Sequence, residues 1–221
     1  QITLLTTMGY EPDLTAIDLI INRTGKGFGD TKYSVICNPA TVKPLTEEEK
    51  ALEKIGNITL DLTHYQGKDI YSDGDIEDEI LGIVKELSPV EYPRVIEERA
   101  SWPILYHLSA LRENIVDWLP IQKTDKVLEV GSGCGAITGA LARKAASVTC
   151  VDLSKKRSTI NAYKNADCDN VTIHVGNFKD IEPDLATDFD YVCLIGVFEY
   201  GQGYMGSDKP YHDFLNILKK H

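Results

Sequence analysis

The second half of the chain alternates between short apolar runs and longer segments of mixed polarity. Near-continuous apolar runs of four to six residues predict buried strands. The predicted strands are residues 126–130, 147–151, 171–175 and 190–195. The predicted helices are residues 136–145, 154–165 with Ser154 as N-cap, and a last helix from about Pro210. This alternation indicates a doubly wound, mostly parallel α/β sheet, which binds ligands at the carboxyl ends of its strands.

The first hundred residues have a less regular pattern, typical of an α+β region. Runs rich in β-branched residues predict strands at residues 2–6, 15–22, 33–37 and 57–62. The run Gly25, Gly27 and Gly29 indicates a hairpin loop between the second and third of these, although a ligand-binding loop is the alternative. A capping-box start at Thr46 predicts a helix to about Ile55.

Two helices and a hinge are expected between these halves. The apolar spacing of Ile76, Ile80 and Ile83 predicts an amphipathic helix that ends near Leu87. Residues 88–103 contain three prolines, which indicate a hinge. A helix over residues 104–119 is expected to place five apolar side chains on one side: Ile104, Leu108, Leu111, Ile115 and Trp118. We therefore expect an accessory region at residues 1–100 and a ligand-binding domain at 101–221.

Charge and cysteine content restrict the partners and the compartment. The formal net charge is −11, and residues 1–100 carry 10 Lys and Arg against 19 Asp and Glu. Without a basic face we expect no nucleic-acid partner. No apolar run approaches the roughly 20 residues of a membrane helix, so no membrane association is expected. The five cysteines show no C-x-x-C spacing, which favours buried free thiols in a cytoplasmic protein.

The acidic cluster at residues 73–79 raises the possibility of a metal site. The cluster lacks the spacing of a calcium-binding loop. Carboxylates are also favoured at the N-terminus of a helix, where the helix dipole is positive. A structural role is favoured, and no metal site is expected.

The central motif is a glycine-rich turn between a predicted strand and a predicted helix. Gly131, Gly133 and Gly135 permit positive φ angles and a close approach of the backbone to a ligand. The run Gly131-x-Gly133-x-x-Ala136 also satisfies a dinucleotide fingerprint, with Asp152 at about the spacing of a ribose carboxylate. On the glycines alone, an NAD-binding oxidoreductase therefore remains an alternative.

Three features favour another nucleotide. Glu129 is acidic near the end of the first strand, the third glycine follows at a spacing of two, and Asn177 follows the third strand. Residues 126–200 resemble the class I S-adenosylmethionine-dependent methyltransferases, and the similarity extends over about residues 104–221. The matching segments are residues 127–135 (VLEVGSGCG), 151–154 (VDLS), 176–178 (GNF) and 189–192 (FDYV).

The resemblance implies a Rossmann-like fold, S-adenosylmethionine as cofactor and S-adenosylhomocysteine as product. It implies that Asp152 binds the ribose hydroxyls, that Leu153 packs on adenine, and that Asn177 and Phe178 bind the adenine edge. The glycine loop under the methionine part would comprise Gly131, Ser132, Gly133 and Gly135, and Glu129 would hold this loop.

The acceptor side is less defined by the resemblance. The implied acceptor is a small molecule or a glycan. Members of this subgroup often carry Glu-His at the end of the fourth strand, where this chain has Glu199 and Tyr200. A histidine base is therefore in doubt, and Glu199 and Tyr200 are candidates for acceptor contact.

The family's sheet continues beyond the helix at which this chain stops. We therefore expect a fragment that is incomplete at its C-terminus and can be inactive alone, unless residues 1–62 supply the missing cover. A non-catalytic module with a vestigial cofactor site is a further alternative. The acceptor identity and the oligomeric state are left open by the sequence.

Overall fold

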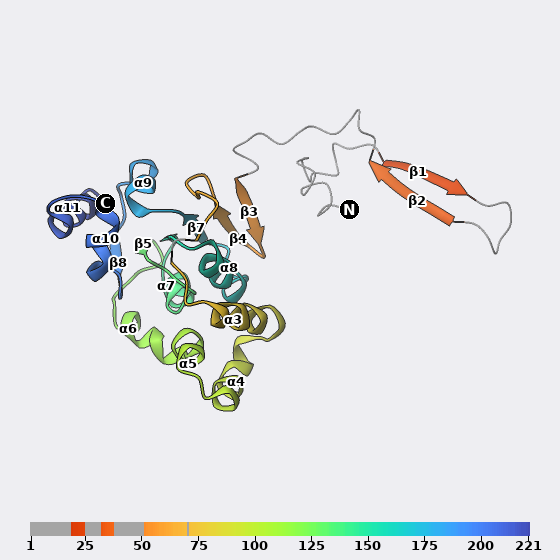
Figure 1. Ribbon diagram of the computed structural model, residues 1–221, viewed down its shortest axis with the longest axis horizontal. Helices are drawn as coiled ribbons and strands as arrows, with labels where there is room; N and C mark the ends of the chain where they lie inside the picture. Colours follow the sequence, from red (N-terminus) through yellow and green to blue (C-terminus); the bar gives the residue numbers. More distant parts are fainter. Residues whose placement is uncertain (1–18, 25–31, 38–50, 70) are drawn as a thin grey trace. The chain divides into compact units, whose positions relative to one another are not determined.

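The computed structural model of the protein describes residues 19–24, 32–37, 51–69 and 71–221 (Figure 1). The chain divides into two compact units, Gln1–Ala51 and Leu52–His221. The sequence suggested a boundary after residue 100. The boundary between the two units instead lies after Ala51. The reason is that residues 52–61 pair into the same sheet as the C-terminal strands.

The first unit contains an antiparallel pair of strands, β1 (Leu19–Thr24) and β2 (Lys32–Cys37). Leu19 lies opposite Cys37, and Thr24 lies opposite Lys32. The predicted pairing of these two strands is confirmed. The glycine run between them and the strand predicted at residues 2–6 lie outside the described residues.

The second unit is built on a six-stranded sheet with the order β3-β4-β7-β6-β5-β8. Its strands are β3 (Leu52–Ile55), β4 (Ile58–Asp61), β5 (Lys126–Val130), β6 (Ser147–Asp152), β7 (Val171–Val175) and β8 (Tyr191–Leu194). Only the β3–β4 pair is antiparallel, and the other four pairings are parallel. The predicted mostly parallel sheet is confirmed.

The hairpin β3–β4 corrects one prediction from the sequence. Residues 52–55, expected to end a helix, form the edge strand β3, while residues 46–50 lie outside the described part. A tight turn with Gly56 at φ 58° allows β3 to pair back on β4. The hairpin extends the sheet beside β7, at the edge opposite to β8. Among the described residues, no strand pairs with the outer side of β8.

Helices cover both faces of this sheet. On one face, α7 (Thr138–Lys144) and α8 (Lys155–Lys164) pack on Val127, Val148 and Ile173. On the other face, Leu128 and Val130 pack with residues of α9 (Phe178–Ile181), α10 (Gly201–Met205) and α11 (Pro210–Leu218). This two-sided burial explains why the central strands are almost continuously apolar.

Ser154 acts as the N-cap of α8, as predicted, and its hydroxyl accepts a hydrogen bond from the backbone N–H of Arg157. Two short 3-10 helices complete this region of the chain. They are η4 (Glu182–Asp184) and η5 (Phe198–Tyr200).

A second apolar cluster joins the segment before β5 to α8. The predicted amphipathic helix is confirmed as α3 (Asp75–Glu86), which buries Ile80 and Ile83 against Ile160 of α8. Figure 1 shows α3 close to α8, with α4 (Tyr92–Arg99) and α5 (Trp102–Leu108) following it. The segment before β5 is therefore part of the domain core.

The predicted hinge at residues 88–103 is wrong. The segment is largely helical and comprises η2 (Pro89–Glu91), α4 and the start of α5. Each of its three prolines occupies one of the first two positions of a helix, where the missing N–H has no intrahelical partner to lose. The prolines therefore start helices here.

The single helix predicted over residues 104–119 is also wrong. Ser109 is extended at φ −70° and ψ 125°, and its hydroxyl accepts a hydrogen bond from Leu111 N–H. This cap ends α5 and starts η3 (Ala110–Glu113), which is followed by α6 (Asn114–Asp117). As a result, Leu111 and Trp118 are exposed and not buried beside Ile104.

Among the helices of the described ranges, none has both the length and the apolar character that a membrane crossing would need.

The hairpin β3–β4 should contribute to the stability of the second unit. Leu60 of β4 is fully buried, and Leu52 of β3 is 47% exposed. Leu60→Ala should lower the free energy of unfolding by about 2–5 kcal/mol, because a cavity is left in the core. Leu52→Ala, the matched control, should lower it by less than about 1 kcal/mol. Urea unfolding followed by circular dichroism measures both, and equal effects would contradict this role of the hairpin.

Candidate functional site

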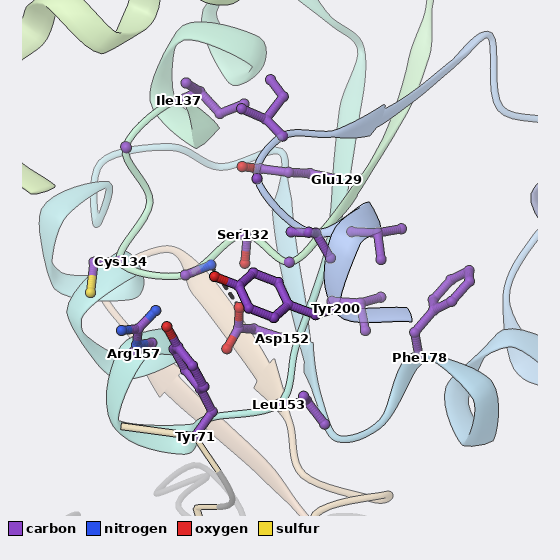
Figure 2. Close-up of a pocket in the computed structure, with 18 of the residues that line it drawn as sticks. Tyr71, Glu129, Ser132, Cys134, Ile137, Asp152, Leu153, Arg157, Phe178 and Tyr200 are labelled. Atoms are coloured by element: carbon purple, nitrogen blue, oxygen red, sulfur yellow. Dashed lines mark hydrogen bonds between the residues drawn. The ribbon is translucent and has the colours of Figure 1, made fainter. Parts of the chain in front are cut away.

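A cavity of about 360 Å³ lies at the carboxyl ends of the central parallel strands (Figure 2). Residues that end or follow β5, β6, β7 and β8 line one part of it. The segment before β5 lines another part, with Tyr71, Asp73, Trp102, Tyr106 and His107. The volume lies in the range typical of small-molecule and cofactor sites.

The glycine loop lies between β5 and α7 and is fixed by hydrogen bonds to β6. The N–H groups of Gly131 and Ser132 donate to the carbonyl of Val151 at 2.7 and 3.2 Å. Gly131 has φ 75°, and a Cβ there would lie 2.2 Å from Cγ2 of Val197, so a larger residue would displace the segment that follows β8. Glycine is therefore required at this position by both backbone conformation and space.

Not every predicted loop residue lines the cavity. Gly131, Ser132 and Gly133 do, and the Ser132 hydroxyl is buried with no hydrogen-bond partner among the described residues. Gly135 does not line the cavity. It packs against α8 instead, where a Cβ on Gly135 would lie 2.2 Å from Oδ1 of Asn161. Gly135 thus permits the close packing of the loop on α8.

Asp152 lies at the end of β6, where it contacts the glycine loop and lines the cavity. Its Oδ2 accepts the N–H of Gly133 at 2.7 Å, and its Oδ1 accepts the N–H of Ser154 at 3.0 Å. Burial raises the pKa of Asp152, and these two N–H groups oppose the rise. Each carboxylate oxygen retains a lone pair for a ligand hydroxyl.

Glu129 is 4% exposed and lies within β5 beneath the glycine loop. Its Oε2 accepts a hydrogen bond at 2.7 Å from the Thr138 hydroxyl, which in turn accepts one from the Asn161 amide at 3.1 Å. Burial raises the pKa of Glu129 to about 7, although the Thr138 hydrogen bond favours the ionised form. Glu129 therefore links β5 to α7 and, through the Thr138 hydroxyl, to α8.

The predicted adenine-side residues also line the cavity: Leu153, Asn177 and Phe178. The Asn177 side chain caps α9 by accepting the N–H of Lys179, and its amide donates to the Tyr204 carbonyl at 3.3 Å. The Phe178 ring packs on Phe214 with 5.7 Å between centroids. These contacts fix the wall formed by β7 and α9.

The two acceptor candidates differ in position. Tyr200 lines the cavity, with its ring centroid 6.3 Å from that of Tyr71. Glu199 is exposed in η5 and does not line the cavity, and its backbone carbonyl accepts the Tyr211 hydroxyl at 3.2 Å. The structure thus brings only Tyr200 to the other site residues.

A charged network beside the cavity was missed by the sequence analysis. Arg157 of α8 donates to Oε1 of the fully buried Glu77 at 2.7 Å and also pairs with Asp73. Its guanidinium lies 4.3 Å from the centroid of the Tyr71 ring. Figure 2 shows Tyr71 beside Arg157, with Asp152 close by. Glu77 and Arg157 are 80 residues apart in the chain, so no local pattern in the sequence reveals this network.

The acidic segment at residues 73–79 is accounted for by ion pairs. Glu77 and Asp73 bind Arg157, Asp78 binds Lys156, and Glu79 binds Arg99. Within residues 51–69 and 71–221, no group of three or more His, Cys, Asp or Glu side chains is arranged to hold a metal ion.

Comparison with known families identifies the domain that carries this cavity. Residues 127–219 match the family model described as "Methyltransferase domain". The matched residues make up less than half of the chain and lie within its second unit. The match includes β5 to β8, the glycine loop and Asp152, and it confirms the family that the motifs suggested.

The methyltransferase domain is also similar to solved structures, each at low identity. One is titled precorrin 8w decarboxylase, from Methanobacterium thermoautotrophicum (22% identity, 50% of this chain and 55% of that chain, TM-score 0.41). Another is a putative S-adenosyl-L-methionine-dependent methyltransferase from Methanococcus maripaludis (20%, 59% and 58%, 0.38). A third is an S-adenosylmethionine-dependent methyltransferase from Thiobacillus denitrificans in complex with S-adenosyl-L-homocysteine (14%, 69% and 52%, 0.39).

The chain spans less than two thirds of the length of each of these structures. A search of curated proteins finds no match. The assignment to the family therefore rests on the family model together with the sheet and the cavity described above.

The buried carboxyl group of Glu129 should make stability depend on pH. Its pKa is raised from 4.5 to about 7 in the folded protein, so the folded state holds a proton that the unfolded state releases above pH 4.5. The free energy of unfolding of the wild type, relative to Glu129→Gln, should fall by up to about 1.4 kcal/mol per pH unit between pH 4.5 and 7.

Urea unfolding at several pH values measures this difference. Glu86→Gln, an exposed position of α3, is the matched control. A difference between wild type and Glu129→Gln that stays constant over this pH range would contradict the buried, protonated state of Glu129.

Proposed function

We propose that the protein transfers a methyl group from S-adenosylmethionine to a small-molecule or glycan acceptor by in-line displacement at the sulfonium. The observation that carries this proposal is the position of Asp152. Its carboxylate lies at the end of the second parallel strand and shares one cavity with a glycine loop of the methyltransferase family. A carboxylate at this position can accept hydrogen bonds from two neighbouring ribose hydroxyls.

The residues present fit S-adenosylmethionine. The buried hydroxyl of Ser132 has no partner among the described residues, and the position of a Cβ on Gly133 would meet no atom within 4 Å. Both features leave polar groups and space for a ligand beside the loop. Leu153 and Phe178 supply apolar surface for a flat adenine ring, and Asn177 supplies an amide oxygen at its edge.

The cofactor would supply a sulfonium, whose methyl group leaves while the S–C electron pair remains on sulfur. The contribution of the chain is mainly to bind and orient. Asp152 and the glycine loop would fix the ribose and the methionine part, and Glu129 would help to position the loop by holding α7, which follows it, through Thr138. Accurate alignment of the two reacting groups lowers the barrier by removing their relative motion before reaction.

The acceptor would enter between the segment before β5 and the end of β8. Tyr71, Trp102, Tyr106 and Tyr200 line this part of the cavity, and Trp102 and Tyr200 are 71% and 50% exposed. Exposed aromatic faces with polar tips suit a compact organic molecule or a sugar. The net charge of −11 disfavours a polyanionic nucleic acid. Tyr200 is the side chain that we propose to contact the acceptor.

An alternative function is hydride transfer with a nicotinamide cofactor, since Asp152 and two of the glycines also suit NAD. Calorimetric titration of the 221-residue chain with S-adenosylhomocysteine and with NADH separates the two functions. S-adenosylhomocysteine alone should bind. Asp152→Ala should weaken its binding by about 2–3 kcal/mol, or roughly 30- to 150-fold, because contacts to a charged group are lost.

Asp169→Asn, an exposed position outside the cavity, is the matched control and should bind like the wild type. Binding of NADH in place of S-adenosylhomocysteine would overturn the proposal. Binding of S-adenosylhomocysteine without label transfer from methyl-labelled S-adenosylmethionine to any small-molecule or glycan fraction would favour a non-catalytic module.

A further inference from the structure

Arg112 is a cavity-lining cation that the proposed function has not used. It lies in η3, before β5, and its guanidinium lies 3.9 Å from the centroid of the Tyr106 ring. Its Nε is buried and has no hydrogen-bond partner within the described part of the chain. Among the described residues, no carboxylate oxygen lies within 4.0 Å of the Arg112 guanidinium, the distance that defines an ion pair. The neighbouring Glu113 pairs with Arg143 instead.

The other cavity-lining arginine differs in this respect. The charge of Arg157 is matched by Glu77 and Asp73, both in ion-pair contact with it. A guanidinium that faces a cavity without a matching carboxylate keeps its donors for a ligand, because an unpaired buried charge is unfavourable. Arg112 therefore marks a position in the cavity that suits an anion.

One further cation, Lys164, lies near this position. Lys164 donates to the backbone carbonyl of His107 at 2.8 Å, and burial together with nearby Arg112 lowers its pKa to about 8. Burial, Arg157 and Lys164 lower the pKa of His107 to about 4, so His107 is neutral at pH 7. Glu113 and Glu129 partly offset these cations. Among the residues of α5 and η3 that line the cavity, none carries a negative side chain.

We propose that Arg112 binds the α-carboxylate of the amino-acid tail of S-adenosylmethionine. This inference rests on the proposed function. The adenosine part needs no cation, since the ribose donates its hydroxyls to Asp152, whereas the tail carries a carboxylate. A guanidinium can bind a carboxylate through two parallel hydrogen bonds, which a lysine cannot reproduce.

The position of the glycine loop supports this choice of ligand group. Cys134, Ala136 and Ile137, from the end of the loop, line the same cavity as Arg112. A ribose bound at Asp152 would place the tail along the loop, which leads from β5 to α7. Arg143 of α7 pairs with Glu113, the residue next to Arg112. Arg112 therefore lines the same cavity as the end of the loop that would receive the tail.

Two ligands that differ only in the tail test the proposal. S-adenosylhomocysteine has the amino-acid tail, and 5′-methylthioadenosine has the same adenosine and a thioether without it. Arg112→Gln should weaken binding of S-adenosylhomocysteine roughly 10- to 100-fold and change binding of 5′-methylthioadenosine by less than about twofold. Arg112→Lys should recover part of the lost affinity. Isothermal titration calorimetry measures each dissociation constant.

Arg143→Gln is the matched control, because Arg143 contacts the same 3-10 helix but does not line the cavity. It should leave both affinities unchanged. Equal weakening of both ligands by Arg112→Gln, or no weakening of either, would overturn the role of Arg112 while the proposed function stands. Failure of the wild type to bind either ligand would contradict the proposed function, and the role of Arg112 with it.

Discussion

The convergence of backbone N–H groups on the end of β6 is the constraint on which the site depends. Gly131 and Ser132 donate to the Val151 carbonyl, and Gly133 and Ser154 donate to the Asp152 carboxylate. These bonds hold the glycine loop across the ends of two neighbouring parallel strands. They also orient the carboxylate toward the cavity, because its remaining lone pairs face the space that the glycines leave open.

The segment before β5 completes the site and is integral to the core of the second unit. Asp69 accepts the N–H groups of Lys155 and Lys156 at the start of α8, and Glu77 binds Arg157 in the same first turn. Removal of either partner of such a buried pair would leave an uncompensated charge, so the pair ties α3 to the start of α8. The family motifs thus supply the cofactor side of the cavity, and residues 71–112 supply the opposite wall.

The sequence predicted the elements whose signals are local. Ser154 was recognisable as an N-cap, and the apolar strands β5 to β7 follow from their continuous burial. The sequence failed where distant contacts decide the structure, since residues 52–55 form a strand only by pairing with β4. Prolines at helix starts resembled a hinge, and Ser109 interrupts a pattern that is otherwise helical. Arg112 and Arg157 could not be assigned, because their surroundings come from segments far apart in the chain.

The central claim is that the cavity at the ends of β5 and β6 binds S-adenosylmethionine through Asp152. The most direct test is a crystal structure of the protein with S-adenosylhomocysteine. We expect both ribose hydroxyls within hydrogen-bond distance of the Asp152 carboxylate, at about 2.5–3.0 Å, with the tail along the glycine loop. A ligand bound elsewhere, or a ribose turned away from Asp152, would contradict this account.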